Sequence, residues 1–93
     1  MSELKQQITN EMKAAMRAKE KTRLGTIRMI LAELKRIEVD ERIELDDTRV
    51  LAVLDKMSKQ RRDSISQFEE AARMDLADAE RQELEVIKTF LPQ

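Results

Sequence analysis

The sequence predicts an all-α protein, a small four-helix bundle-like domain that spans residues 1–93. Glycine and proline occur once each, so little interrupts a helical chain. Apolar residues make up 41% of the chain, and they recur three and four positions apart, which is the spacing of one helical face. A disordered chain of similar charge would carry fewer apolar residues and no such spacing. A length of 93 residues leaves room for one core only.

The first helix is expected to begin at Ser2, a good N-cap that is followed by Glu3 in the first turn. Its apolar stripe consists of Leu4, Ile8, Met12, Ala15 and Met16. Around residues 19–22 the stripe changes phase, which indicates the start of a second amphipathic helix. The apolar stripe of that helix consists of Leu24, Ile27, Ile30, Leu31, Leu34 and Ile37.

Residues 40–47 (DERIELDD) form a polar, acidic connection, in which Asp46 or Asp47 is expected to cap the next helix. The third helix is expected from about Thr48 to Ala72. Its apolar side consists of Val50, Leu51, Leu54, Met57, Ile65 and Phe68.

Asp75 is the expected N-cap of the fourth helix, and Pro92 is expected to end it. The apolar face of this helix consists of Leu76, Ala79, Leu84, Ile87 and Leu91. Four helices with short links around one core predict a small bundle.

The stretch KQRRDSISQF places two adjacent arginines in the third helix. At about 100° per residue, Arg61 points along the apolar stripe and Arg62 points to its edge. A guanidinium near the core needs a carboxylate partner. The same projection brings Glu80, with Glu83 nearby, and also Glu38 toward Arg61, and each could supply the carboxylate. The sequence therefore predicts a structural ion pair of Arg61 with Glu80 first and Glu38 second.

Charge is segregated along the chain although the formal net charge is −1. Residues 11–36 contain eight basic and three acidic side chains, and residues 63–85 contain two basic and eight acidic ones. A basic helical face can follow a phosphate backbone, and on this ground Lys13 and Arg17 are candidate RNA contacts. The alternative is a solvated charged face, and no aromatic residue lies among the bases to stack on single strands.

The composition excludes most familiar catalytic sites. The chain has no cysteine and no histidine, which removes disulfides, thiol nucleophiles, zinc-finger ligands and histidine acid/base chemistry. Adjacent carboxylates such as Asp46 and Asp47 are typical of helix caps, so we assign no catalytic residue, metal, cofactor or small-molecule substrate. The polar N-terminus MSELKQQITN and the lack of a long apolar stretch favour a cytosolic protein with no membrane partner.

Several blocks together resemble the YqeY family: MKAAM at 12–16, RL at 23–24 with IR at 27–28, LDD at 45–47, KQRRDSI at 59–65 with QF at 67–68, and FLP at 90–92. The resemblance covers essentially the whole chain, and KQRRDSI followed by QF is its most specific block. It implies an all-helical domain. Because that family is related to the tail region of the B subunit of the tRNA-dependent aspartyl/glutamyl amidotransferase, it also implies a role in holding tRNA while another subunit does the chemistry. The matching motifs make Arg28, Lys59 and Arg62 candidate RNA contacts.

The chain departs from the family pattern in two places. Family members usually continue past the Leu-Pro with a second small helical domain, so the chain resembles the N-terminal domain alone. The family commonly has glycine at the position of Ala72, which moves the expected turn nearer Met74.

The predicted function is a non-catalytic module that binds tRNA or assists the subunits of an amidotransferase, a glutamine-dependent carbon–nitrogen ligase. The alternative is a protein–protein interaction or assembly module with no nucleic-acid role.

Overall fold

The computed structural model describes residues 2–92, and within them it contains four α-helices and no strand, as the sequence predicts. The helices are α1 (Glu3–Arg17), α2 (Lys21–Glu41), α3 (Asp47–Glu70) and α4 (Met74–Lys88).

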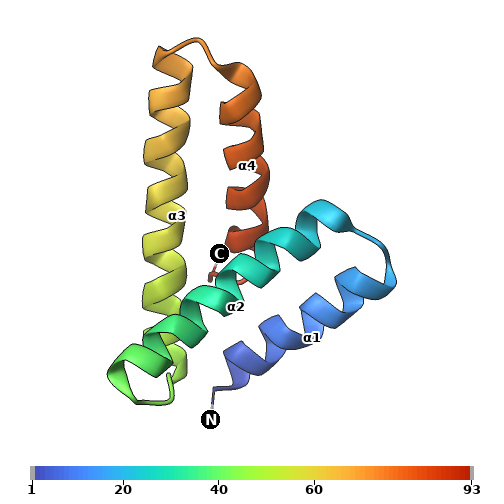
Figure 1. Cartoon of the computed structure of the whole chain (residues 1–93), viewed down its shortest axis with the longest axis vertical. Helices are drawn as coiled ribbons and strands as arrows, with labels where there is room; N and C mark the ends of the chain where they lie inside the picture. Colours follow the sequence, from blue (N-terminus) through green and yellow to red (C-terminus); the bar gives the residue numbers. More distant parts are fainter. Residues whose placement is uncertain (1, 93) are drawn as a thin grey trace.

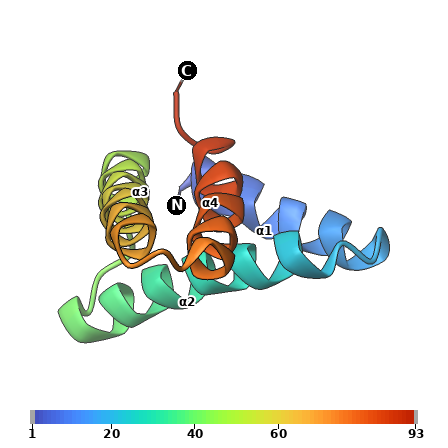
Figure 2. The same ribbon diagram turned by 90° about the horizontal axis from the view of Figure 1, so that it is seen from above.

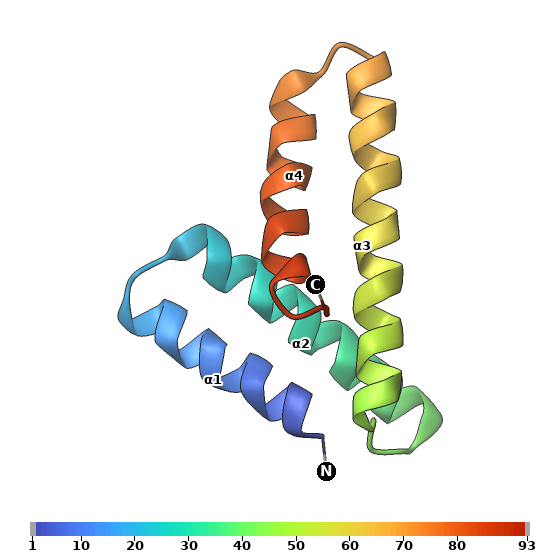
Figure 3. The same cartoon turned by 180° about the vertical axis from the view of Figure 1, so that it is seen from behind.

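The four helices form two antiparallel pairs that cross each other (Figure 1). α1 lies beside α2 in one pair, and α3 lies beside α4 in the other. α2 runs across the ends of the second pair, and in Figure 2, where α3 and α4 are seen end-on, it passes beneath both. The turn between α3 and α4 therefore lies far from the α1–α2 pair (Figure 3).

The main core lies where the two helix pairs cross. Every helix, the α2–α3 connection and the segment after α4 contribute buried side chains to it: Ile8, Ala15, Ile27, Ile30, Leu34, Leu45, Val50, Leu54, Met57, Ile87 and Phe90. Burying one such isoleucine or leucine side chain stabilises the fold by roughly 1.5–3 kcal/mol. The crossing point is thus the part of the molecule in which packing fixes the helices.

Side-chain caps begin α1 and α3, as the sequence predicts. The Ser2 hydroxyl accepts a hydrogen bond from the Lys5 amide at 3.0 Å, and it donates one to the Asp47 carboxylate at the start of α3. Asp46 caps α3 by accepting from the Arg49 amide at 2.9 Å. Ser2 therefore holds the starts of two helices together.

Each connection between helices contains one non-glycine residue in the left-handed region: Lys19, Arg42 and Ala72, with φ of 59°, 56° and 58°. After α3, the Ala72 amide donates to the Glu69 carbonyl at 3.1 Å and the Arg73 amide to the Phe68 carbonyl at 2.8 Å. This is the Schellman pattern, which needs a left-handed residue at the position of Ala72. Alanine in place of glycine thus leaves the turn centred at residue 72 and does not move it toward Met74.

Some expected boundaries and core positions are wrong. Met16 is 48% exposed and lies outside the core, and Leu76 and Ala79 on α4 are also exposed, whereas Ala77 is buried. Beyond the crossing point α4 packs against α3 alone, so its buried face is narrower than the apolar pattern predicts.

Two further differences concern the connections. Arg73, not Asp75, occupies the N-cap position of α4, and Asp75 in the first turn forms an ion pair with Arg73 at 3.1 Å. Leu45 is only 1% exposed although acidic residues surround it in the sequence, because it folds back under α2 into the core.

Candidate polyanion-binding surface

Arg61 belongs to the packing between α3 and α4. Its side chain is 13% exposed, and its Nε lies 2.8 Å from Glu83 Oε2 and 3.5 Å from Glu80 Oε2. Glu80, the partner expected first, is within ion-pair distance, and Glu83 one turn away is closer. Burial raises the pKa of the Glu80 carboxyl, the neighbouring charge of Glu83 raises it further, and Arg61 opposes both effects. The guanidinium is thus occupied inside the protein.

Glu38, the second expected partner of Arg61, is engaged elsewhere, so this part of the prediction is wrong. Its carboxylate lies 2.6 Å from the Lys5 ammonium of α1 and accepts a hydrogen bond from the Leu45 amide at 2.9 Å. These two hydrogen bonds hold the pKa of Glu38 below its ordinary value. Glu38 faces α1 and the loop that buries Leu45, on a side of α2 that α4 does not reach.

Most cations of α3 and α4 are held in ion pairs. Arg49 pairs with Glu41 at 3.0 Å, Lys59 with Asp63 at 3.8 Å, and Arg81 with Asp78 at 2.6 Å. Arg23 and Arg36 of α2 are also paired, Arg23 with Glu11 at 3.5 Å and Arg36 with Glu33 at 2.6 Å.

A second group of cations, all in or between α1 and α2, forms no ion pair with any residue that the structure describes. We call it the basic surface, and it consists of Lys13, Arg17, Lys19, Lys21, Arg28 and Lys35, all of them exposed. Between residues 13 and 35 the acidic side chains are Glu20 and Glu33, and Glu33 is neutralised by Arg36.

The basic surface has a simple geometry. Lys21, Arg28 and Lys35 follow one another at seven-residue intervals, which is close to two helical turns, so they form a line along α2 with steps of about 10 Å. This line lies about half a turn around α2 from Ile30 and Ile37, which face the α3–α4 pair. On α1, Lys13 and Arg17 lie on the side opposite the buried Ile8 and Ala15. The cations therefore cover the outside of the α1–α2 pair.

The five expected RNA contacts divide between two places. Lys13, Arg17 and Arg28 belong to the basic surface. Lys59 and Arg62 lie on α3, in the yellow segment that rises away from the α1–α2 pair in Figure 1. Lys59 pairs with Asp63, and Arg62 donates a hydrogen bond to the Ser58 hydroxyl at 3.2 Å.

Lys19, Lys21 and Lys35 contribute to the positive charge of residues 11–36 but are not among the RNA contacts expected from the sequence. The seven-residue spacing of Lys21, Arg28 and Lys35 was the available signal, because it places the three on one side of any continuous helix.

The carboxylates that stand next to each other in the sequence serve the fold. Asp46 caps α3, Asp47 accepts hydrogen bonds from Ser2 and Leu4, and Glu69 pairs with Arg81. Among residues 2–92 no three acidic side chains gather closely enough to hold a metal ion. Each helix between Ser2 and Pro92 is too short or too polar to traverse a lipid bilayer.

Comparison with known proteins gives matches along almost the whole chain. The family described as Yqey-like protein matches residues 5–93. The protein named altered inheritance of mitochondria protein 41, mitochondrial, is 36% identical over 85 residues in Vanderwaltozyma polyspora, which is 90% of this chain and 46% of that protein. The protein of the same name in Clavispora lusitaniae is 40% identical over 81 residues, which is 87% of this chain and 47% of that protein.

An uncharacterized protein of Schizosaccharomyces pombe is 32% identical over 79 residues, which covers 85% of this chain and 64% of that protein. The chain thus spans about half the length of the two named relatives. Since the family match extends over nearly every residue, the chain belongs to the YqeY family.

Proposed function

We propose that this chain is a non-catalytic RNA-binding module that holds tRNA through the basic surface of α1 and α2 and assists the subunits of an amidotransferase. The observation that carries the proposal is the basic surface itself: six exposed cations without an ion pair among the described residues, gathered on one helix pair.

The distribution of paired and unpaired cations supports a polyanion as the ligand. A charged face that serves only solubility has cations and carboxylates interspersed, as along α3. On the outside of α1 and α2, cations stand with almost no competing carboxylate, so a phosphate backbone can approach without displacing an internal ion pair. Each phosphate that these cations neutralise releases a counterion, which favours binding irrespective of base sequence.

The choice of tRNA rests on the resemblance to the tail region of the amidotransferase B subunit. In this proposal the glutamine-dependent chemistry belongs to partner subunits, and the chain contributes affinity for the RNA. We place this activity in the cytosol, whereas the names of the yeast relatives describe those proteins as mitochondrial.

The test is the affinity for tRNA as a function of salt. If all six cations contact phosphates, the logarithm of the association constant falls against the logarithm of salt concentration with a slope of roughly −4 to −5. Neutralising the line on α2 in the triple variant Lys21→Gln/Arg28→Gln/Lys35→Gln should lower the steepness of that slope by about 2–3.

Two matched variants complete the experiment. Arg73→Gln removes an exposed cation from the far end of the molecule and should leave the slope unchanged. Lys59→Gln/Arg62→Gln tests the α3 candidates, and a loss of slope there would extend the RNA contact onto α3. A slope near zero in the unmodified protein, or an equal loss in Arg73→Gln and the α2 variant, would rule out the proposed surface.

A further inference from the structure

Five cations of the basic surface stand in two rows. Lys21, Arg28 and Lys35 form the row on α2, and Lys13 and Arg17, four residues apart, form a second row on α1. The α1–α2 pair is antiparallel, and both rows begin close to its turn, so the α1 row lies beside the half of α2 that carries Lys21 and Arg28 (Figure 1). Packed helices have axes about 8–10 Å apart, which sets the approximate separation of the rows.

The surface between the cations of the α2 row is low. Gly25 and Ala32 alternate with these cations at steps of three and four residues, and both are exposed. The space above Gly25 is open, because a Cβ atom added there would meet no atom of a neighbouring element within 4 Å. A rigid polyanion can therefore come close to the ammonium and guanidinium groups along the whole row.

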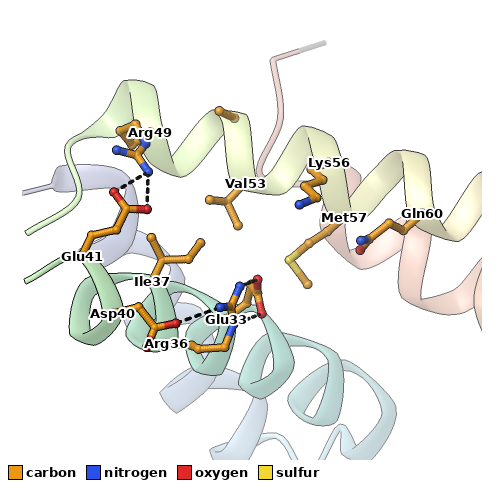
Figure 4. Close-up of a pocket in the computed structure, with 11 residues that line it drawn as sticks. Glu33, Arg36, Ile37, Asp40, Glu41, Arg49, Val53, Lys56, Met57 and Gln60 are labelled. Atoms are coloured by element: carbon orange, nitrogen blue, oxygen red, sulfur yellow. Dashed lines mark hydrogen bonds and ion pairs between the residues drawn. The ribbon is translucent and has the colours of Figure 1, made fainter. Parts of the chain in front are cut away.

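The side of α2 toward α3 is different, because its charges are neutralised. It is hollowed by a pocket of about 350 Å³, in which Arg36 lies 2.6 Å from Glu33 and 3.1 Å from Asp40 (Figure 4). Arg49 of α3 lies 3.0 Å from Glu41 in the same pocket. A phosphate backbone on this side would compete with three carboxylates, so the outside of the α1–α2 pair is the better surface for it.

Two acidic side chains lie near the rows. Glu38 is close enough to Lys35 for that charge to contribute to the lowered pKa of the Glu38 carboxyl, but its hydrogen bonds go to Lys5 and to the Leu45 amide. Glu20 is exposed in the connection between the two helices. The rows keep a net positive charge after both carboxylates are counted.

We propose that the two rows bind the double-stranded stems of tRNA and not its single-stranded loops, an inference that rests on the proposed function. A stem presents two phosphate strands at once, one to each row, whereas a single strand that lies along one row leaves the other unused. The α2 row is about 21 Å long, and over that length a duplex with the charge spacing of DNA carries about 12 phosphates, against about six on one strand. The stem therefore neutralises more of the surface.

The aromatic side chains of the protein support the same choice. Proteins that bind single strands stack the bases on aromatic side chains. This chain has two phenylalanines and no tyrosine or tryptophan. Phe90 is buried in the main core, and Phe68 is half-buried on α3, so neither lies on the two rows. A loop would gain phosphate contacts on this surface but no stacking.

The test compares an RNA duplex of 14 base pairs, one unpaired strand of it and a DNA duplex of the same sequence, with concentrations expressed per phosphate. Five contacts on the duplex predict a log–log salt slope of about −4.5, and three on the single strand predict about −2. The RNA duplex should accordingly bind at least tenfold more tightly than the single strand at 0.1 M salt and should displace tRNA. Equal or weaker binding of the DNA duplex fits contacts to phosphates, and tighter binding of DNA would overturn the assignment to tRNA.

Removing the α1 row tests whether both rows are used. Lys13→Gln/Arg17→Gln should make the slope for the duplex less steep by about 2 and leave the slope for the single strand nearly unchanged. An equal loss for both probes would contradict the two-row arrangement.

Adding the missing ring tests the role of stacking. Ala32→Trp places an indole between Arg28 and Lys35 and should raise the affinity for the single strand roughly fivefold to 150-fold, the range for one stacked base, while it lowers the affinity for the duplex. Ala79→Trp places the same ring on the exposed face of α4 and should change neither affinity. Unchanged circular dichroism and melting temperature show that both variants are folded.

Failure of this inference is distinct from failure of RNA binding. If tRNA binds with a steep salt slope but the single strand binds as tightly as the RNA duplex, the preference for stems is overturned and RNA binding stands. If neither tRNA nor the duplex shows salt-dependent binding, both proposals fall. A gain of duplex affinity in Ala32→Trp would also count against close contact of a stem with the α2 row.

Discussion

Replacing Ala72 by glycine should stabilise the protein. Ala72 has a φ of 58°, and a non-glycine residue in the left-handed region costs about 1–2 kcal/mol relative to the right-handed one. Glycine removes that cost but loses more conformational freedom on folding, by about 0.5–1 kcal/mol. The two Schellman hydrogen bonds of Ala72 and Arg73 are backbone bonds and survive the substitution. The expected net gain in the free energy of unfolding is therefore about 0.5–1 kcal/mol.

Urea denaturation followed by circular dichroism at 222 nm measures this gain, and for a chain of this size it corresponds to roughly 2–8 °C in melting temperature. Ala71→Gly is the matched control. Ala71 has a φ of −84°, so glycine there relieves nothing and should destabilise the protein by about 0.5–1 kcal/mol. If both variants destabilise by the same amount, the left-handed alanine stores no strain and the reasoning fails.

Four further predictions concern the contacts between helices. Glu83→Gln should lower the free energy of unfolding by about 1 kcal/mol because Arg61 Nε loses its charged acceptor. Glu80→Gln should have a smaller effect or raise stability at neutral pH, since burial holds the pKa of Glu80 above its unfolded value and its charged form is disfavoured in the fold. Ser2→Ala should cost about 1–2 kcal/mol because it removes the cap of α1. The folded protein holds the pKa of Glu38 below its ordinary value. The stabilising contribution of Glu38 is therefore complete above the unfolded pKa and is lost as pH falls through the folded pKa. In Glu38→Gln the free energy of unfolding should fall less as the pH is lowered.

Equilibrium unfolding in urea between pH 3 and pH 7 measures all of these changes. Glu85→Gln, on the exposed face of α4, is the control for the two variants of that helix. A greater loss in Glu80→Gln than in Glu83→Gln would contradict the assignment of Glu83 as the main partner of Arg61. A steeper acid-side loss in Glu38→Gln would contradict the sign given for Glu38.

The sequence predicts those features of the fold that depend on one helix at a time. Spacing of apolar residues identifies Ile8, Ile27 and Leu34 as buried, and hydroxyl or carboxylate residues ahead of a stripe identify the caps at Ser2 and Asp46. Such patterns belong to one helix at a time, but packing decides how much of each stripe is covered, and Met16, Leu76 and Ala79, which the same spacing selects, are exposed.

Features that depend on how far one helix is shifted along its axis relative to another cannot be predicted from the spacing of residues within a single helix. Glu80 and Glu83 are one turn apart on nearly the same side of α4, and only the offset between α3 and α4 brings Glu83 closer to Arg61. Glu38 was assigned to the wrong partner because projection gives its angle around α2 but not the identity of the element on that side. Leu45 lies in a connection, where no periodicity reports burial.

The expected RNA contacts also divide into those that depend on one helix and those that depend on how the helices pack. Charge counting located the basic segment in α1 and α2, and three of the five expected RNA contacts fall on its surface. Lys59 and Arg62 were grouped with them by their sequence motif, yet the crossing of the helix pairs carries α3 away from that surface.

The crossed arrangement also divides the molecule into regions of different local stability. The end of the α3–α4 pair that lies beyond the crossing has exposed Leu76 and Ala79 and shares no side chain with the main core past Met57 until Ile87. Amide protons near residues 64–80 should therefore exchange with solvent through local opening at a lower free energy than those of α2, which need global unfolding. The free end of the α3–α4 pair can open and close while the crossing point, where α2 packs against α3 and α4, stays folded.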